Sequence, residues 1–167
     1  MKKVTLATDG VCIGNPGPGG WACVLCFGSV QKELFGYAPL TTNNRMEMMA
    51  AIQGLLALKE PCEVEITTDS EYLLHGITKW AAAWKKPHWW RKRSPVSNVD
   101  LWIELDHLNA AHRTTWLWTR GHSGHPGNGQ SASRPAFARP RPGLRASPAA
   151  GEPFRRRSTG RAFRWGG

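Results

Sequence analysis

The sequence predicts an α/β domain in which five strands and several helices share one core. The expected strands lie at residues 3–9, 21–28, 31–38, 63–69 and 114–120. Short connections join the first three strands, which indicates an antiparallel meander. A helix with clear 3.6-residue periodicity over 44–59 separates them from the fourth strand. The chain has 167 residues, 41% of them hydrophobic, so its length suits one domain with a sizeable core.

Turn residues and periodicity define the elements between these strands. The Gly/Pro-rich run GNPGPGG at 14–20 predicts a turn after the first strand, which is expected to end at Asp9. Asn44 is a good N-cap for the helix over 44–59, whose apolar residues recur at helical spacing. The remaining expected elements are helical segments at about 70–78 and 80–86, a basic Trp-rich loop at 85–95, a helix from 100 to about 112, and a loop at 121–128.

The end of the chain differs in composition from the rest. Residues 1–128 hold 13 Lys and Arg against 11 Asp and Glu, whereas residues 129–167 hold nine Arg and one acid, Glu152. Most of the net charge of +10 therefore belongs to the tail and is not by itself evidence of nucleic-acid binding. The tail shows no strand or helix period, which predicts a disordered segment after a domain of residues 1–128. An out-of-frame translation of a GC-rich gene is the favoured explanation of its composition, and a genuine basic tail is the alternative.

The sequence predicts neither a membrane span nor a signal peptide. No stretch reaches the roughly 18 apolar residues of a transmembrane helix, and the N-terminus lacks a long apolar segment. A cytosolic location is therefore expected, and the four cysteines are expected to be free thiols there. Cys23 and Cys26 form a C-x-x-C, but it lies in a strand-like run that would point them to opposite faces, and a second pair to complete a zinc site is missing.

Three acidic residues stand in three separate motifs: Asp9 in TDG, Glu47 in NNRMEM and Asp69 in TTDS. Carboxylates that converge from distant segments suit a Mg²⁺-dependent phosphodiesterase, because Mg²⁺ prefers oxygen ligands and a pair of such ions can stabilise the attacking and leaving oxygens. If Asp9 and Asp69 end neighbouring strands, their carboxylates repel each other unless a cation neutralises them.

Each acid also has a structural interpretation that the sequence leaves open. Asp9 precedes a glycine, as turn residues often do. Glu47 lies three residues after Asn44, a spacing close to that of a capping box. Asp69 stands where it can cap a helix over Glu71–Thr78.

Several long motifs in one order make this chain resemble bacterial type 1 ribonuclease H over roughly residues 3–128. The motifs are TDG with CIGNPGPGGW, TTNNRMEMMAAI, TTDSEY, GITKWAAAWKK, NVDLW and GHSGHPGN. The resemblance implies a ribonuclease H-like fold, a five-stranded mixed sheet flanked by helices. It also implies hydrolysis of the RNA strand of RNA–DNA hybrids by two-metal catalysis, leaving 5′-phosphate and 3′-hydroxyl ends.

The resemblance assigns catalytic roles to four residues and leaves one position unfilled. Asp9, Glu47 and Asp69 would hold Mg²⁺, for which Mn²⁺ is a possible substitute, and His122 would assist with the attacking water or the leaving product. His125 is expected to be structural. The family's fourth acid belongs at Ala132, and the terminal helix that carries it is expected to be absent. That loss would weaken metal binding and remove several kcal/mol of packing.

The resemblance also implies two sets of residues that contact the hybrid. Those matching the groove that senses 2′-hydroxyls are Cys12, Asn15, Asn43, Asn44 and Glu71, the last in place of a more usual Gln. Those matching a basic handle are Trp80, Trp84, Lys85, Lys86, Arg91, Lys92 and Arg93. Trp80 and Trp84 share a helix face and would pack on sugars or on the core. The cations would bind DNA phosphates without reading sequence, although such a run can also be only a solvated face.

The predicted function is therefore a monomeric endonuclease that removes RNA primers and stray hybrids during replication. Two alternatives remain open at this point. One is a hybrid-binding protein whose cleavage fails without the fourth acid. The other is an unstable product of a frameshifted gene.

Overall fold

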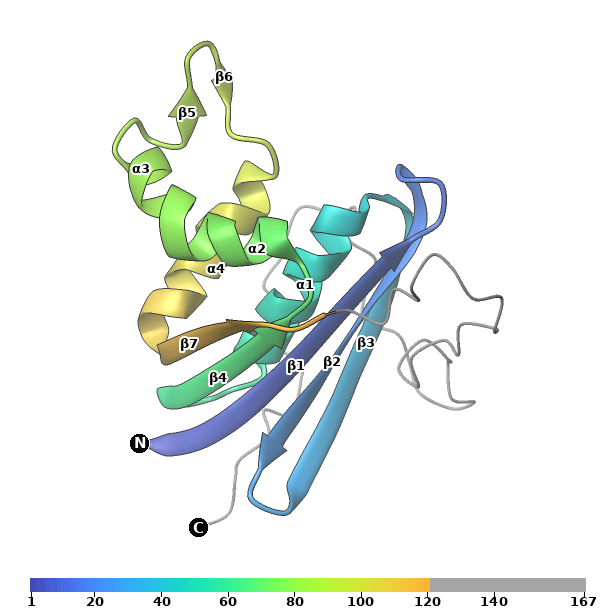
Figure 1. Cartoon of the computed structure of the whole chain (residues 1–167), viewed down its shortest axis with the longest axis vertical. Coiled ribbons are helices and arrows are strands. Elements are labelled where there is room, and N and C mark those ends of the chain that lie inside the picture. The colour runs from blue at the N-terminus through green and yellow to red at the C-terminus, as the bar shows by residue number, and fades with distance from the viewer. Residues whose placement is uncertain (121–167) are drawn as a thin grey trace.

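The computed structural model describes residues 1–120 of the chain. Its centre is a five-stranded mixed sheet with the strand order β3-β2-β1-β4-β7 (Figure 1). The strands are β1 (Lys2–Cys12), β2 (Gly17–Phe27), β3 (Val30–Thr41), β4 (Cys62–Thr68) and β7 (Arg113–Trp118). Neighbours among β1, β2 and β3 are antiparallel, whereas β4 is parallel to both β1 and β7. The predicted fold class and the antiparallel meander are confirmed.

The helices pack on the sheet and on one another. They are α1 (Asn43–Leu56), α2 (Glu71–His75), the π-helical turn η1 (Gly76–Trp80), α3 (Ala81–Lys85) and α4 (Val99–Ala111). Helix α1 contacts β1 and β2, and α4 contacts α1 and β7. Beyond α3 the chain projects as a small hairpin of β5 (Trp90–Arg91) and β6 (Ser94–Pro95) (Figure 1). The predicted basic loop at 85–95 thus contains a two-stranded hairpin.

Alternating burial explains how β1 positions the core. Val4 and Leu6 are buried on the face that meets α1, while Thr5 and Ala7, which alternate with them along the strand, are exposed. Trp102 of α4 is fully buried, and a Cβ atom at Gly76 would lie 1.9 Å from its ring. A glycine is therefore needed where η1 crosses this indole.

The turn after the first strand is shorter than predicted. Strand β1 continues through Cys12, so Asp9 lies inside the strand opposite Ala22 rather than at its end. Strand β2 already begins at Gly17, so four of the seven residues predicted as a turn, 17–20, belong to this strand. The glycines make this possible, because a Cβ atom at Gly17 would stand 1.9 Å from the carbonyl oxygen of Ile13. The interpretation of Asp9 as a turn residue is wrong.

Two predicted helix caps are also wrong. The N-cap of α1 is Thr42, whose side chain accepts a hydrogen bond from the Arg45 backbone N–H, and Asn44 lies within the first turn. Glu47 is therefore too far along the helix for a capping box. Ser70, not Asp69, caps α2 by accepting from the Leu73 N–H. The structural interpretations of both acids are thereby removed.

The cysteines match their prediction. All four are free, with Cys23 buried in the core and Cys26 half-buried on the opposite face of β2. Burial raises the pKa of the Cys23 thiol to about 12, which keeps it protonated and unreactive. None of the helices within residues 1–120 is long and apolar enough to cross a membrane.

Candidate active site

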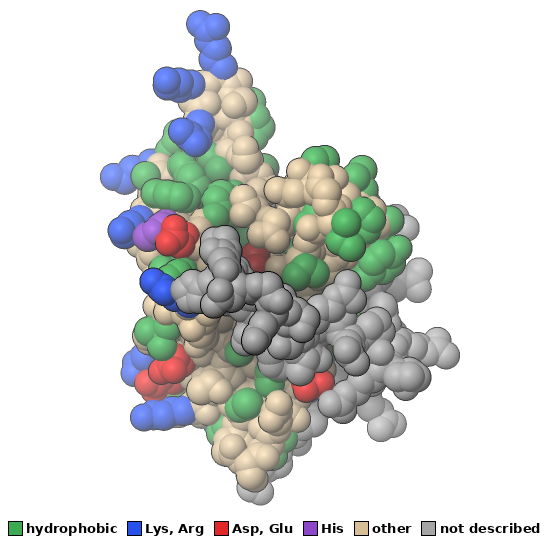
Figure 2. Space-filling model, turned by 45° about the vertical axis from the view of Figure 1, so that its right-hand side comes forward, with side chains coloured by type: hydrophobic (Ala, Val, Ile, Leu, Met, Phe, Trp, Pro, Cys, Tyr) green, Lys and Arg blue, Asp and Glu red, His purple; other side chains and the backbone are tan. Residues whose placement is uncertain are grey.

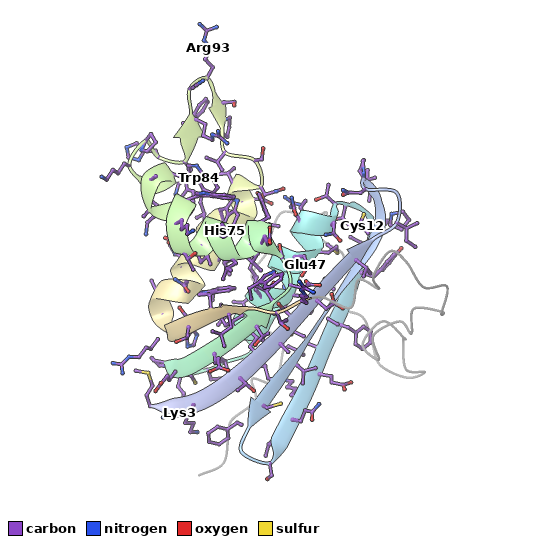
Figure 3. All side chains as sticks on the ribbon, viewed as in Figure 1. Lys3, Cys12, Glu47, His75, Trp84 and Arg93 are labelled. Carbon is purple, nitrogen blue, oxygen red and sulfur yellow. The ribbon has the colours of Figure 1, made fainter. Side chains whose placement is uncertain are left out.

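The structure brings the three predicted acids together. Asp9 lies in β1, Glu47 in α1, and Asp69 immediately follows β4. One carboxylate oxygen from each lies within 4.8 Å of the others. Figure 3 shows Glu47 near the centre of the molecule, where α1 meets the sheet.

Strand pairing and one glycine cause this convergence. Ala7 of β1 is paired with Thr67 of the parallel strand β4. Asp9 and Asp69 each follow two residues later, so they lie side by side on adjacent segments of the sheet. Helix α1 approaches β1 at Gly10, where a Cβ atom would lie 2.5 Å from the Glu47 backbone nitrogen. Any larger residue at position 10 would hold α1, and with it Glu47, away from Asp9.

The centre of the cluster is electrostatically strained. Glu47 is only 3% exposed, and its burial, together with the carboxylates of Asp69 and Asp9, raises its pKa to about 9. Two buried carboxylate oxygens, Glu47 Oε2 and Asp69 Oδ1, find no hydrogen-bond partner among residues 1–120. Buried acceptors without partners are costly, and three adjoining carboxylates add repulsion.

These residues fit a divalent cation. The cluster offers carboxylate oxygens, the ligand atoms that hard cations prefer, from three rigid elements. Two of these carboxylates have an oxygen without a hydrogen-bond partner among residues 1–120. A cavity of about 160 Å³ opens beside it, lined by Ala7, Thr8, Asp9, Ala22, Cys23, Val24, Thr67, Asp69, Thr119 and Arg120. The cluster is therefore able to hold a metal ion next to an open space.

Three of the predicted groove residues form one unit at the end of β1. The Cys12 thiol donates to the carbonyl oxygens of Thr41 and Gly17, at 3.3 and 3.6 Å. Asn15, in the loop that follows, accepts a hydrogen bond of 3.0 Å from the Asn43 backbone N–H. The loop is thus tied to the first turn of α1, four residues before Glu47. Figure 3 shows Cys12 near the upper tip of the β1–β2 strands.

The other two predicted groove residues lie closer to the acids in sequence. Asn44 is half-buried in the first turn of α1, three residues before Glu47. Glu71 is the first residue of α2, two positions after Asp69, and is exposed. Its carboxylate is not part of the three-acid cluster.

The predicted handle forms a separate surface. Trp80 and Trp84 lie on one helix face with ring centroids 5.8 Å apart, and Trp84 packs edge-on against Trp102 at 5.5 Å. The tryptophans therefore pack on the core while Trp80 stays 39% exposed. Figure 2 shows Lys and Arg side chains along one edge of the molecule and at the hairpin tip.

All five predicted phosphate-binding cations are exposed: Lys85, Lys86, Arg91, Lys92 and Arg93. Lys85 is partly neutralised by Asp106, to which its Nζ atom lies at 3.0 Å. Of the other four cations, Arg91 lies in β5, Lys92 and Arg93 connect β5 to β6, and Lys86 directly follows α3.

Two predicted positions fall outside the described residues. His122, expected to assist catalysis, and Ala132, at the place of a fourth acid, both lie beyond residue 120. The predicted loss of the terminal helix and the tail at 129–167 also fall there.

The sequence did not single out the residues that brace the site. Arg45, two residues before Glu47 on α1, binds Asp100 through two hydrogen bonds of 3.0 and 2.8 Å and reaches Asn98 at 3.3 Å. Tyr72 accepts hydrogen bonds from Asn98 and Trp102, both at 3.1 Å. These contacts join α1, α2 and α4 at the base of the hairpin. The one signal in the sequence that could have identified these residues is that they lie within the motifs shared with ribonuclease H.

Comparison with known proteins agrees with the fold and the acidic cluster. Residues 1–134 match the family model described as RNase H. The chain belongs to the ribonuclease H family. A protein named ribonuclease H from Aeromonas hydrophila is 57% identical over 129 residues, covering 77% of this chain and 84% of its own. One of the same name from Pseudomonas putida (strain W619) is 57% identical over 127 residues, covering 75% and 86%.

Among solved structures, the chain resembles LC9-RNase H1, described as a type 1 RNase H with the type 2 active-site motif. The two are 33% identical with a TM-score of 0.67, over 74% of this chain and 65% of that one, slightly less than two thirds. The resemblance to bacterial ribonuclease H inferred from the motifs is confirmed. The ribonuclease H family consists of metal-dependent nucleases, and the acidic cluster is consistent with that dependence.

Proposed function

We propose that this chain cleaves the RNA strand of RNA–DNA hybrids as a monomeric, Mg²⁺-dependent endonuclease that leaves 5′-phosphate and 3′-hydroxyl ends. The observation that carries the proposal is the meeting of Asp9, Glu47 and Asp69, with ligand atoms within 4.8 Å, in a chain of the ribonuclease H family. Asp9, Glu47 and Asp69 would hold the metal.

When bound, a pair of Mg²⁺ ions supplies water activation and stabilises the leaving 3′-oxygen. The carboxylates of Asp9, Glu47 and Asp69 would bind and orient these ions from β1, α1 and the end of β4, elements fixed by the core. Glu47, with its pKa raised to about 9, must lose its proton to serve as a ligand. His122 would handle a proton of the water or the product.

The hybrid would lie across two surfaces with different tasks. Cys12, Asn15 and Asn43 form a small, uncharged unit suited to a shallow minor groove, where 2′-hydroxyls distinguish RNA from DNA. The exposed cations around the hairpin suit DNA phosphates. Because the groove unit and Glu47 share α1, substrate bound in the groove is held in register with the acids.

The proposal is tested by incubating the purified full chain with an end-labelled RNA–DNA hybrid in Mg²⁺, beside the Asp9→Asn variant. We expect RNA-strand cleavage by the wild type and at least about 100-fold less by the variant, because losing a metal ligand costs more than losing its outer partners. A folded wild-type protein that binds the hybrid without cutting it would identify a binding protein instead. An aggregating protein would identify an unstable gene product.

A further inference from the structure

We propose that Trp118 is a positioning residue for Asp69, holding that acid in place for the metal. The inference rests on the proposed role of Asp69 as a metal ligand and extends it to a residue outside the acidic cluster. The indole Nε1–H of Trp118 donates a hydrogen bond of 3.2 Å to the backbone carbonyl oxygen of Asp69.

The register of the sheet sets up this contact. Trp118 is the last residue of β7 and is paired with Thr68, the last residue of β4. The Thr119 N–H donates to the Thr68 carbonyl oxygen at 2.9 Å, which continues the ladder one step beyond the strands. The indole therefore reaches the first residue after β4, which is Asp69.

The backbone on either side of Asp69 is held independently. The Ser70 N–H donates to the Thr68 hydroxyl oxygen at 3.1 Å, and the Ser70 hydroxyl and carbonyl oxygens accept from Leu73 and Leu74 at 3.1 and 3.0 Å. The peptide carbonyl of Asp69 itself is held from another strand, by Trp118. The Asp69 carbonyl and the Ser70 N–H belong to one peptide unit, so the bonds from Trp118 and to the Thr68 hydroxyl together fix the rotation of the unit beside the Asp69 side chain.

The Asp69 side chain needs such support. Its Oδ1 atom is buried and has no hydrogen-bond partner among residues 1–120, and its hydrogen bond with the protonated Glu47 is lost once both acids ionise around a metal, so the backbone must then fix much of the direction of the carboxylate. Groups outside the first ligand shell commonly orient ligands and tune metal affinity in this way.

Core packing does not account for Trp118. Its side chain is 45% exposed at the end of an edge strand, whereas Trp102 is fully buried. A large indole left in solvent contributes less apolar burial than a core aromatic. The hydrogen bond to Asp69 is the specific contact that a phenyl ring in the same place would lose.

The chain offers a matched control two residues away. Trp116, on the same strand and two residues farther from the acids, donates its indole N–H to Asn109 Oδ1 at 2.8 Å. Trp118→Phe and Trp116→Phe therefore remove the same donor from the same strand, and only the first touches Asp69.

The test measures Mg²⁺ binding to the full-length protein by calorimetry and by the ¹⁵N indole resonances of its nine tryptophans. The resonances missing from the two variants assign Trp118 and Trp116 in the wild type. We expect Mg²⁺ to shift the Trp118 indole signal and to leave that of Trp116 in place. Trp118→Phe should bind Mg²⁺ about three- to tenfold more weakly, and Trp116→Phe within about twofold of wild type.

Cleavage supplies the second measurement. At limiting Mg²⁺ the kcat of Trp118→Phe should fall while KM for the hybrid stays constant, and raising Mg²⁺ should restore kcat. Wild-type Mg²⁺ affinity in Trp118→Phe, or equal losses in both variants, would overturn the positioning role while leaving the proposed function intact. A wild-type protein that neither binds Mg²⁺ nor cleaves would refute both proposals, and this is seen without any variant.

Discussion

The acidic cluster and the basic hairpin are held in opposite ways. Glu47 is 3% exposed and sits on a helix packed into the core. The hairpin of β5 and β6 has two residues in each strand, all exposed, and three nearby residues have positive φ: His88, Trp89 and Lys92. The acids are fixed by the core, whereas the cations project from it.

This contrast suits two different tasks, metal binding by the acidic cluster and attraction of the substrate by the basic hairpin. Metal ligands must hold their geometry closely, so they belong on strands and helices that cannot shift without disturbing the core. Phosphate attraction acts over several ångströms and tolerates a loosely held element. The rigid arrangement lowers the stability of the metal-free protein, because it holds three carboxyl groups close together.

The largest expected effect comes from Glu47→Gln, which separates activity from stability. Cleavage should fall more than about 100-fold, because a direct metal ligand is lost. The metal-free variant should be more stable than wild type by about 1–3 kcal/mol at pH 8, since the wild-type Glu47 must take up a proton to be buried beside Asp9 and Asp69, and a neutral amide avoids that cost. Chemical denaturation of both proteins in a chelating buffer measures this difference.

The pH dependence of that difference has a definite sign. The pKa of Glu47 is raised from 4.5 to about 9 in the folded protein. Its protonated form therefore contributes stability that is fully present below about pH 4.5 and is lost progressively as pH rises towards 9. The advantage of Glu47→Gln should be small at pH 5 and grow towards pH 9. An advantage that does not change with pH would show that Glu47 titrates normally.

Gly10→Ala should disturb the cluster without changing any of its acids. The new Cβ atom would meet the backbone of Glu47 at 2.5 Å, so α1 must move away from β1. We expect a loss of about 1–3 kcal/mol in stability and about 100-fold in cleavage. Gly20→Ala is the control, because its Cβ atom would lie 3.4 Å from the Gly36 oxygen. Equal activity losses in both variants would contradict the close approach at Gly10.

Removing the hairpin charge should weaken binding and leave chemistry unchanged. In the triple variant Arg91→Ala, Lys92→Ala and Arg93→Ala, the slope of log affinity against log salt should fall by about 2–3, with kcat within about twofold of wild type. Fluorescence anisotropy with labelled hybrid at several salt concentrations measures the slope.

An equal change of charge elsewhere provides the comparison. Lys3, Lys59 and Arg113 are exposed and lie at the opposite end of the sheet or beyond it. Their triple alanine variant should retain most of the salt dependence. If both triple variants lose the same slope, net charge rather than the hairpin governs binding.

The smallest expected effect concerns the brace between α1 and α4. The Arg45 guanidinium lowers the pKa of Asp100, whose side chain is 61% exposed, so solvent weakens the pair. A double-mutant cycle with Arg45→Ala and Asp100→Ala should give a coupling of about 0.5–1 kcal/mol at pH 7. The coupling should weaken once pH falls below the usual pKa of Asp100, 3.8, and be lost as pH passes through its lowered pKa in the folded protein, since protonation removes the charge. A coupling unchanged at pH 2 would show that charge plays no part.

Hydrophobic periodicity and sequence motifs predicted the order of the strands and helices, but tertiary contacts determine the residues at which they begin and end. The five strands and the main helices were predictable because alternation and helical spacing record burial directly. The continuation of β1 past Asp9 was not, because it depends on pairing with glycines of β2 that resemble a turn in sequence. The identity of the α1 cap also depended on geometry, since Thr42, Asn43 and Asn44 are all good caps.

The candidate site shows the same division. The three acids were predictable from their motifs, and strand order made the meeting of Asp9 and Asp69 an expectation. The burial of Glu47 and the hydrogen bond from Trp118 to Asp69 arise from packing between distant segments. No local pattern in the sequence encodes them.

The central claim is that a metal ion relieves the strain of a buried, protonated carboxylate cluster. It is tested most directly by titrating Mg²⁺ into the full-length protein at pH 7.5 by calorimetry, in buffers of different ionisation enthalpy. We expect the release of close to one proton per protein, because the pKa of Glu47 is raised to about 9 before the metal binds. We also expect Glu47→Gln to release none. Tight Mg²⁺ binding with no proton release by the wild type, or equal release by the variant, would contradict this claim.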